Sequence, residues 1–363
     1  MMTDEILETL KKLILAPGPT GFEHQVREVF IKEIKDHVDQ VQVDTLGNVI
    51  AIKTGRKKNG PKIMVAAHLD EIGLIVKYVD EAGWVYFELL GFVDERALAG
   101  QLVSIHTDHG TVSGVVGIKG KLFAKPEELA KSIPASEMWI DVGVASRKEA
   151  LEIGIKIGDP ITFQKRFEIL RDGNVVCAPS LDNRVGCSVL IEAVREFENE
   201  PHDATIYAVG TVQEEVGCRG AKTAASALNP DVAFVVDTTT GEDPATPRKE
   251  VATKIGGGPA IRLMDQSLML GHITLPRMKQ FLISTAEAER VPYQLEVIPK
   301  VATDAATLHL SGRGILTGSI LIPRRYFHTP LEIAMVSDIH NARRLLTAGI
   351  KNISSLISLP HAG

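Results

Sequence analysis

Five short segments place carboxylates or histidines at, or just after, apolar runs that are typical of strands. In α/β proteins, ligands bind at the carboxyl ends of such strands. The segments are Ala67–Glu71, Ser180–Gly186, Thr211–Gly217, Phe234–Asp237 and Tyr326–Pro330. Among their side chains are two histidines, His68 and His328, and the four carboxylates of Asp182, Glu214, Glu215 and Asp237. Imidazole and carboxylate are ligands for zinc and similar divalent cations.

Each carboxylate also has an ordinary structural interpretation. Asp182 lies just before a predicted helix, where Asp is a favoured N-cap, and Asp237 ends a predicted strand, where it could serve as a turn residue. Glu214 and Glu215 would point to opposite sides of an extended strand. A turn could let both carboxylates reach one site, with one on a metal and the other acting on a water. A solvated turn is the alternative.

The two histidines lie in defined backbone contexts. Residues two apart on a strand face the same way, so Asp70 can hydrogen-bond the His68 ring and fix its tautomer, as carboxylates do for metal-bound histidines. Pro330 favours an extended conformation at Thr329, which places His328 in a defined loop. Taken singly, either ring could simply pack against neighbouring side chains.

The whole set carries more information than its members. A single catalytic zinc needs only three protein ligands. The surplus indicates two divalent cations about 3.5–4 Å apart, clamping a water and a carbonyl. Zinc or cobalt suits these ligands best, and manganese is also compatible.

The elements that must position these residues alternate between helix and strand. Apolar spacing predicts helices over about 23–37, 184–197, 219–228 and 276–289 and from about 336 onward. Strands are predicted over 41–43, 49–52, 62–67, 204–212, 232–236, 293–298 and 315–322. This pattern predicts an α/β domain made of residues 1–71 and 163–363.

Residues 72–162 differ from the rest of the chain in their pattern of predicted secondary structure. Short strands and turns follow one another without a long amphipathic helix, which predicts a compact β-rich insert. Gly158-Asp159-Pro160 is expected to return the chain to the first domain.

Composition excludes several classes of protein. The chain has 363 residues and a formal net charge of −6, which argues against non-specific nucleic-acid binding. No apolar run approaches the roughly 20 residues of a membrane span, and no secretory signal is evident. The three cysteines show no metal-binding spacing and suit a reducing compartment. These observations predict a cytoplasmic protein that partners neither membrane nor nucleic acid.

At these residues the sequence resembles the M42 glutamyl aminopeptidase family, also known as tetrahedral or TET aminopeptidases. The resemblance covers essentially the whole chain. Its carriers are Ala67–Gly73, Ser180–Arg184, Gln213–Gly217, Asp237, Gly258–Ile261, Thr303–Ala305 and His328–Glu332.

The resemblance implies a metal-dependent aminopeptidase that removes the N-terminal residue from peptides through a water bridging two divalent ions. Asp182 would bridge both ions. His68 and Asp237 would complete one metal site, and Glu215 and His328 the other.

The resemblance also implies that Glu214 is the general base, that Asp70 orients His68, and that the Asp182–Asn183 peptide is cis. The implied fold is a mixed-sheet zinc-peptidase catalytic domain with an inserted, β-rich, PDZ-like dimerisation domain. Dimers would assemble into a hollow, dodecameric tetrahedron.

Three other functions are compatible with parts of the pattern. A dinuclear amidohydrolase acting on N-acylated amino acids would use the same metals. A glycoside hydrolase needs two carboxyls about 5–9.5 Å apart, which adjacent Glu214 and Glu215 rarely achieve. A metal-stabilised scaffold protein would have no use for Glu214 as a base.

Overall fold

A mixed sheet of twelve strands forms the centre of the larger part of the molecule, in the order β1-β2-β12-β3-β13-β17-β18-β11-β10, with β14, β15 and β16 attached beside β17. The computed structural model describes residues 4–198, 200–267 and 270–357. The strands are β1 (Gln40–Val43), β2 (Val49–Lys53), β3 (Lys62–His68), β10 (Glu168–Leu170), β11 (Val175–Ala178), β12 (Thr205–Thr211), β13 (Val232–Thr240), β14 (Ala260–Ser267), β15 (Leu270–Ile273), β16 (Gln294–Pro299), β17 (Leu316–Arg325) and β18 (Glu332–Met335).

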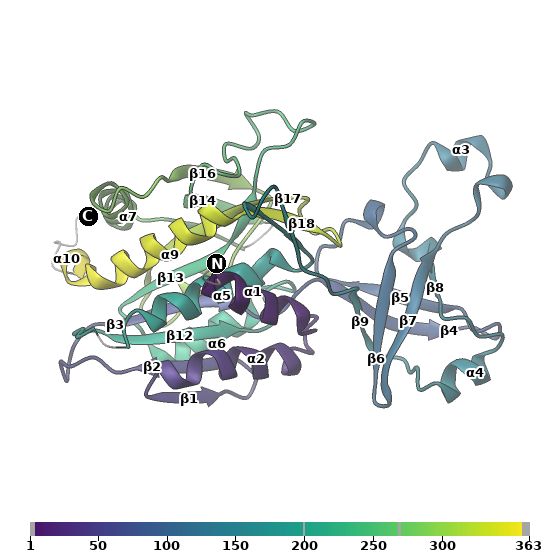
Figure 1. Cartoon of the computed structure of the whole chain (residues 1–363), viewed down its shortest axis with the longest axis horizontal. Coiled ribbons are helices and arrows are strands. Elements are labelled where there is room, and N and C mark those ends of the chain that lie inside the picture. Colours follow the sequence, from purple (N-terminus) through teal and green to yellow (C-terminus); the bar gives the residue numbers. More distant parts are fainter. Residues whose placement is uncertain (1–3, 199, 268–269, 358–363) are drawn as a thin grey trace.

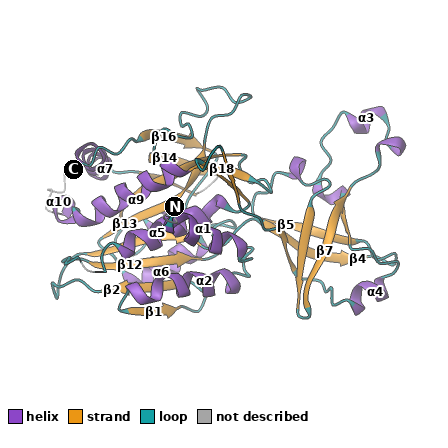
Figure 2. Cartoon of the chain, in the orientation of Figure 1, coloured by secondary structure: helices purple, strands orange, loops and turns teal. Residues whose placement is uncertain are grey.

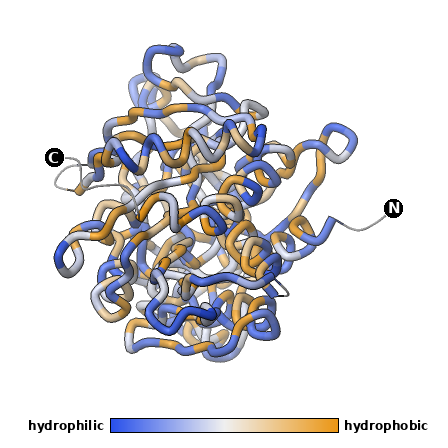
Figure 3. Tube along the Cα trace, turned by 90° about the vertical axis from the view of Figure 1, so that its left-hand side faces the viewer, coloured by the Kyte–Doolittle hydropathy of each residue, from blue (hydrophilic) through white to orange (hydrophobic). Residues whose placement is uncertain are grey.

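Helices cover both faces of this sheet (Figure 2). They are α1 (Glu5–Leu15), α2 (His24–Ile34), α5 (Leu181–Arg195), α6 (Arg219–Leu228), α7 (Pro276–Ala288), α8 (Ala305–Leu308), α9 (Val336–Lys351) and α10 (Ile353–Ile357), with a 3₁₀ turn η1 at Lys35–His37. Strand β3 shows why its sequence is a continuous apolar run. Ile63 and Val65 pack in the core beneath α1, α2, α5, α7 and α9, whereas Met64 and Ala66 pack beneath α6 and α8. A strand buried on both faces needs apolar residues at every position. In the hydropathy view, the hydrophilic segments gather at the outer turns of this part of the molecule (Figure 3).

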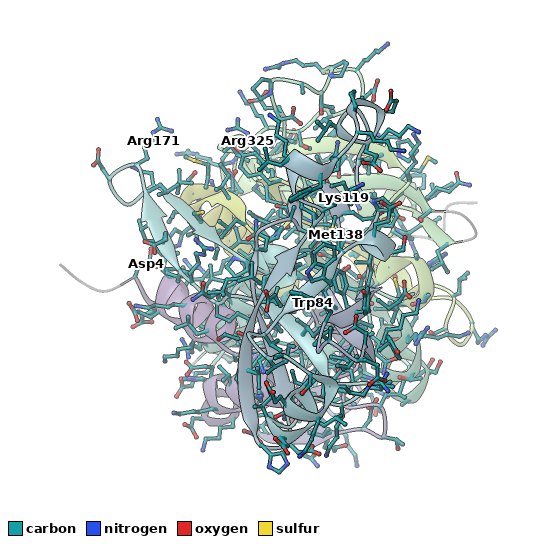
Figure 4. The ribbon with its side chains drawn as sticks, turned by 90° about the vertical axis from the view of Figure 1, so that its right-hand side faces the viewer. Asp4, Trp84, Lys119, Met138, Arg171 and Arg325 are labelled. Carbon is teal, nitrogen blue, oxygen red and sulfur yellow. The ribbon has the colours of Figure 1, made fainter. Side chains whose placement is uncertain are left out.

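A second lobe stands beside the sheet (Figure 1). It is a closed barrel of β4 (Gly73–Val79), β5 (Val85–Leu90), β6 (Leu102–Thr107), β7 (Gly110–Gly117), β8 (Trp139–Asp141) and β9 (Pro160–Phe163). Its helical segments are short: η2 (Glu95–Ala97), η3 (Lys121–Phe123), α3 (Pro126–Leu129), η4 (Ala135–Glu137) and α4 (Arg147–Glu152). The barrel has a hydrophobic core of its own. Figure 4 looks onto this lobe, with Trp84 and Met138 in the middle of the face and Asp4 and Arg171 at the margin.

Two details differ from the expectations drawn from sequence. Pro160 was expected to lie on the return path, but it begins β9, which pairs with β4 and β6, so the chain leaves the barrel only after Phe163. Strand β13 does not end before Asp237 but continues to Thr240, because its whole length pairs with β17. The helix predicted over 219–228 is found with those bounds. No described helix is long and apolar enough to cross a membrane.

A buried ion-pair cluster ties the two connections between barrel and sheet together. Glu71 precedes β4 and is 1% exposed, and its carboxylate contacts the Lys165 ammonium, which follows β9. Glu71 Oε1 also accepts hydrogen bonds from Gly18 N at 2.9 Å and from Arg184 at 3.2 Å. Burial opposes ionisation of Glu71, but Lys165 and Arg184 hold its pKa below the ordinary value.

Replacing Glu71 with Gln is expected to lower the free energy of unfolding by about 3–5 kcal/mol, because two cations would remain buried without their carboxylate. Urea unfolding followed by circular dichroism measures this loss. Glu88→Gln is the matched control, since Glu88 pairs with Lys77 on the barrel surface and exposed pairs contribute little. Equal stability of the two variants would contradict a clamping role for Glu71.

Candidate metal centre

The site lies where four parallel strands end. Strands β12, β3, β13 and β17 run parallel to one another in the middle of the sheet. His68 ends β3, Asp237 lies in β13, Glu214 and Glu215 follow β12, and His328 follows β17. Asp182 begins α5. All six side chains line one cavity of about 510 Å³, so the fold brings the candidate residues together.

One group of candidate ligands surrounds the His68 ring. His68 Nε2 lies 3.1 Å from Asp182 Oδ1 and 3.6 Å from Asp237 Oδ1. One donor atom from each of these three side chains lies within 4.8 Å of the other two, as the ligands of a single cation must. Both carboxylates and the imidazole are shielded from solvent.

A second group forms on the other side of Asp182. His328 Nε2 lies 3.4 Å from Asp182 Oδ2 and 3.4 Å from Glu215 Oε2. These three side chains also meet the spacing that one cation requires. Each oxygen of the Asp182 carboxylate therefore faces a different histidine.

A turn resolves the open question about the adjacent glutamates. Gln213 has a φ of 57°, and Gly217 N donates to Glu214 O at 2.9 Å, so the chain after β12 curls rather than extends. Both carboxylates thereby reach the cavity. Glu214 Oε2 lies 3.9 Å from His68 Nε2, while Glu215 points toward His328.

Asp70 makes contacts beyond the one with His68 that its spacing predicted. The nearest acceptor to His68 Nδ1 is the Asp70 carbonyl at 3.1 Å, with the carboxylate at 3.5 Å. That carboxylate instead accepts from the backbone N–H groups of Glu214 at 3.0 Å and Glu215 at 3.2 Å, and from the Thr20 hydroxyl at 2.8 Å. Asp70 thus contacts both the imidazole and the turn that carries the two glutamates.

Sequence reasoning missed Arg324, a buried arginine beside Asp182. The Arg324 guanidinium, at the end of β17, contacts Asp182 Oδ2 and lies 2.8 Å from Glu332 Oε1. Glu332 Oε2 accepts a hydrogen bond from Asp182 N at 3.0 Å. The available signal was a charged residue directly after the apolar run 320–323, where only a paired charge is tolerated.

The barrel also contributes to the site, which local sequence patterns could not reveal. His328 Nδ1 lies 2.8 Å from the Phe92 carbonyl, which fixes the ring as a metal-bound histidine requires. Asp94 N donates to the His328 carbonyl at 3.0 Å. The Phe92 side chain is 80% exposed and borders the cavity.

Burial and mutual repulsion shape the electrostatics of the carboxylates. Burial, with the charges of Asp237 and other nearby acids, raises the pKa of Glu214 well above its usual range, and burial together with Asp182 does the same for Glu215. Burial alone would raise the pKa of Asp182, but the Arg324 guanidinium and two imidazoles hold it well below its usual range.

The donor set fits divalent cations. Crowded buried carboxylates are stable only when positive charge balances them. Glu215 Oε1 is buried and has no hydrogen-bond partner among the described residues, so it can serve as a ligand atom. The Asp182–Asn183 peptide is cis, as the resemblance implied.

Comparisons with known proteins identify the family of this chain. A family model described as M42 glutamyl aminopeptidase matches residues 47–345. A protein of Acetivibrio thermocellus is 42% identical over 351 residues, covering 96% of this chain and 100% of that protein. The lysyl aminopeptidase of Pyrococcus furiosus is 34% identical over 356 residues, covering 97% of this chain and 99% of the relative.

Solved structures of similar length share the fold. The TET aminopeptidase of the marine sediment archaeon Thaumarchaeota archaeon SCGC AB-539-E09 superposes with a TM-score of 0.91 at 34% identity, covering 98% of this chain and 99% of that one. The TET1 peptidase of Pyrococcus horikoshii, described as assembling into a tetrahedron or a large octahedral shell, gives 0.84 at 32% identity, covering 95% and 99%.

Proposed function

We propose that this chain, which belongs to the M42 glutamyl aminopeptidase family and is a metal-dependent aminopeptidase, acts through two divalent cations held on either side of Asp182. One observation carries the proposal: Asp182 Oδ1 lies 3.1 Å from His68 Nε2, while Oδ2 lies 3.4 Å from His328 Nε2. His68 and Asp237 would hold one cation, and Glu215 and His328 the other.

Two divalent cations held on either side of Asp182 would support hydrolysis. Two bound divalent cations would polarise the scissile carbonyl. They would also lower the pKa of a water, so that the water can lose a proton and attack that carbonyl. Glu214 would accept the proton of that water and pass it to the leaving amine. Asp70 would hold His68 and the Glu214 backbone in place through the contacts described above.

The metal is proposed to be zinc or cobalt, because two imidazoles and several carboxylates suit these borderline ions. The substrates are proposed to be peptides with a free N-terminus. Their α-ammonium group would balance the carboxylates that surround the cavity, whereas an N-acylated residue would leave them without that cationic partner.

A paired assay tests the proposal against a dinuclear amidohydrolase. The protein is expected to release the first residue of a peptide with a free N-terminus and to leave the N-acetylated peptide intact. Chelation should remove activity, and adding back zinc, cobalt or manganese should restore it. Faster cleavage of the acetylated peptide would favour the amidohydrolase, which the aminopeptidase relatives do not favour.

We also propose that residues 1–71 and 163–363 form the catalytic domain and that residues 72–162 form a PDZ-like dimerisation domain. Two side chains of this insert, Leu122 and Phe123, are strongly exposed, at 93% and 79%, which supports contact with a second copy. Dimers would build a tetrahedral dodecamer, by analogy with the P. horikoshii peptidase.

Sedimentation of the intact protein tests this assembly. A mass of about twelve chains is expected for the unchanged protein, and the double change Leu122→Asp and Phe123→Asp is expected to reduce it, because charged side chains resist burial in an interface. A monomer in the unchanged protein would contradict the assembly.

A cytoplasmic location is also proposed, supported by three cysteines that form no disulfide among the described residues.

A further inference from the structure

A thiol and two carboxylates converge beside the proposed dinuclear centre. Glu214, Cys218 and Asp304 each offer a donor atom within 4.8 Å of the other two. Cys218 Sγ lies 3.3 Å from Glu214 Oε1 and 3.3 Å from the Thr303 carbonyl. Glu214 and Cys218 both line the cavity, so a small cation that enters the cavity can reach this cluster.

Asp304 gives independent evidence that the cluster takes a ligand. Its side chain is buried at 1% exposure. Its Oδ2 accepts from the Thr211 hydroxyl at 2.5 Å, whereas Oδ1 has no hydrogen-bond partner within the described part of the chain. A buried carboxylate oxygen without a partner is costly, and a bound cation would supply that partner.

We propose that Glu214, Cys218 and Asp304 form a third cation site, selective for divalent cations more thiophilic than those of the dinuclear centre, such as cadmium, whose occupation inhibits the enzyme. The ligands of the dinuclear centre are nitrogen and oxygen only, whereas this site adds sulfur, which favours softer cations. On binding, the Cys218 S–H bond breaks, its proton passes to solvent, and a sulfur–metal bond forms without change of oxidation state.

Occupation of the third site is expected to inhibit because one of its ligands, Glu214, is the proposed general base. The inhibitory role therefore rests on the proposed function. A Glu214 carboxylate that coordinates a third cation can no longer accept a proton from water. Binding itself does not depend on that role, so the site and the inhibition can be tested separately.

Cadmium titration of the zinc-loaded enzyme tests the site. The thiolate-to-cadmium charge-transfer absorption reports only bonds to sulfur, which the dinuclear centre does not provide. We expect the band to saturate at one cadmium per chain in the unchanged protein and in Cys177→Ala, the control at a partly exposed cysteine outside the cluster. Cys218→Ala should lose the band. A band retained in Cys218→Ala, or none in the unchanged protein, overturns the proposal.

A second variant guards against a folding defect at Cys218. Asp304→Asn keeps the thiol but replaces one carboxylate, and it is expected to weaken cadmium binding by about ten-fold or more. Unchanged affinity in Asp304→Asn contradicts a site built from all three side chains, even if Cys218→Ala cannot be purified.

Peptide hydrolysis in the same titration tests inhibition. Each protein is compared with its own rate before cadmium is added. The rate should fall as the absorption band grows in the unchanged protein and in Cys177→Ala, and it should hold in Cys218→Ala over that range. A band without inhibition overturns the inhibitory role alone. If no protein hydrolyses peptides at all, the proposed function fails, and the band still decides whether the site exists.

Discussion

Glu214→Gln is expected to keep both proposed cations and to lower turnover by about 10²–10⁴-fold, the usual contribution of a positioned general base. The side chain lines the cavity, and Glu214 Oε2 lies 3.9 Å from His68 Nε2. The proposed ligands are complete without it. Glutamine preserves the shape of the side chain but cannot accept the proton. Metal analysis of the purified variant, together with kcat on an aminoacyl reporter substrate, measures both parts of the expectation.

Two other outcomes have distinct meanings. Near-normal turnover in Glu214→Gln would assign the base elsewhere. Loss of one cation together with activity would make Glu214 a ligand rather than a base. Glu88→Gln, the same chemical change on the barrel surface, should match the unchanged enzyme in turnover and metal content.

Asp182→Asn is expected to reduce the bound cations from two per chain to one or none and to lower kcat/KM by about 10³-fold, because cations supply several kcal/mol of stabilisation to the transition state. An amide offers one neutral oxygen in place of two charged ones, so it cannot bridge two cations. Metal content after dialysis and kcat/KM on the same substrate provide the measurements.

The neighbourhood of Asp182 defines the controls. Arg324 contacts the Asp182 carboxylate and also lies 2.8 Å from Glu332, so it keeps one carboxylate partner in the variant. Thermal unfolding should show that the variant remains folded. Asp203→Asn changes an exposed aspartate that pairs with Arg56 and should leave metal content unchanged. Two firmly held cations in Asp182→Asn would contradict the bridging role.

The sequence alone determined the elements whose environment is uniform along their length. Strand β3 is an unbroken apolar run because both of its faces are buried, and the bounds of α6 follow from its local apolar spacing. The candidate ligands could be named because strand ends in an α/β sheet gather at one edge. The metal-dependent aminopeptidase function followed from the family resemblance, and the comparisons confirm it.

Tertiary structure decided what local pattern cannot encode. Asp237 continues a strand because β17 lies beside it, and Glu214 and Glu215 share one cavity because a left-handed residue turns the chain before them. Phe92 reaches His328 from another lobe. These contacts join segments far apart in the chain, and their stability comes from burial and hydrogen bonds that exist only once the chain has folded. The periodicity of apolar residues indicates which side of a helix or strand is buried, whereas tertiary packing determines which residues each side chain contacts.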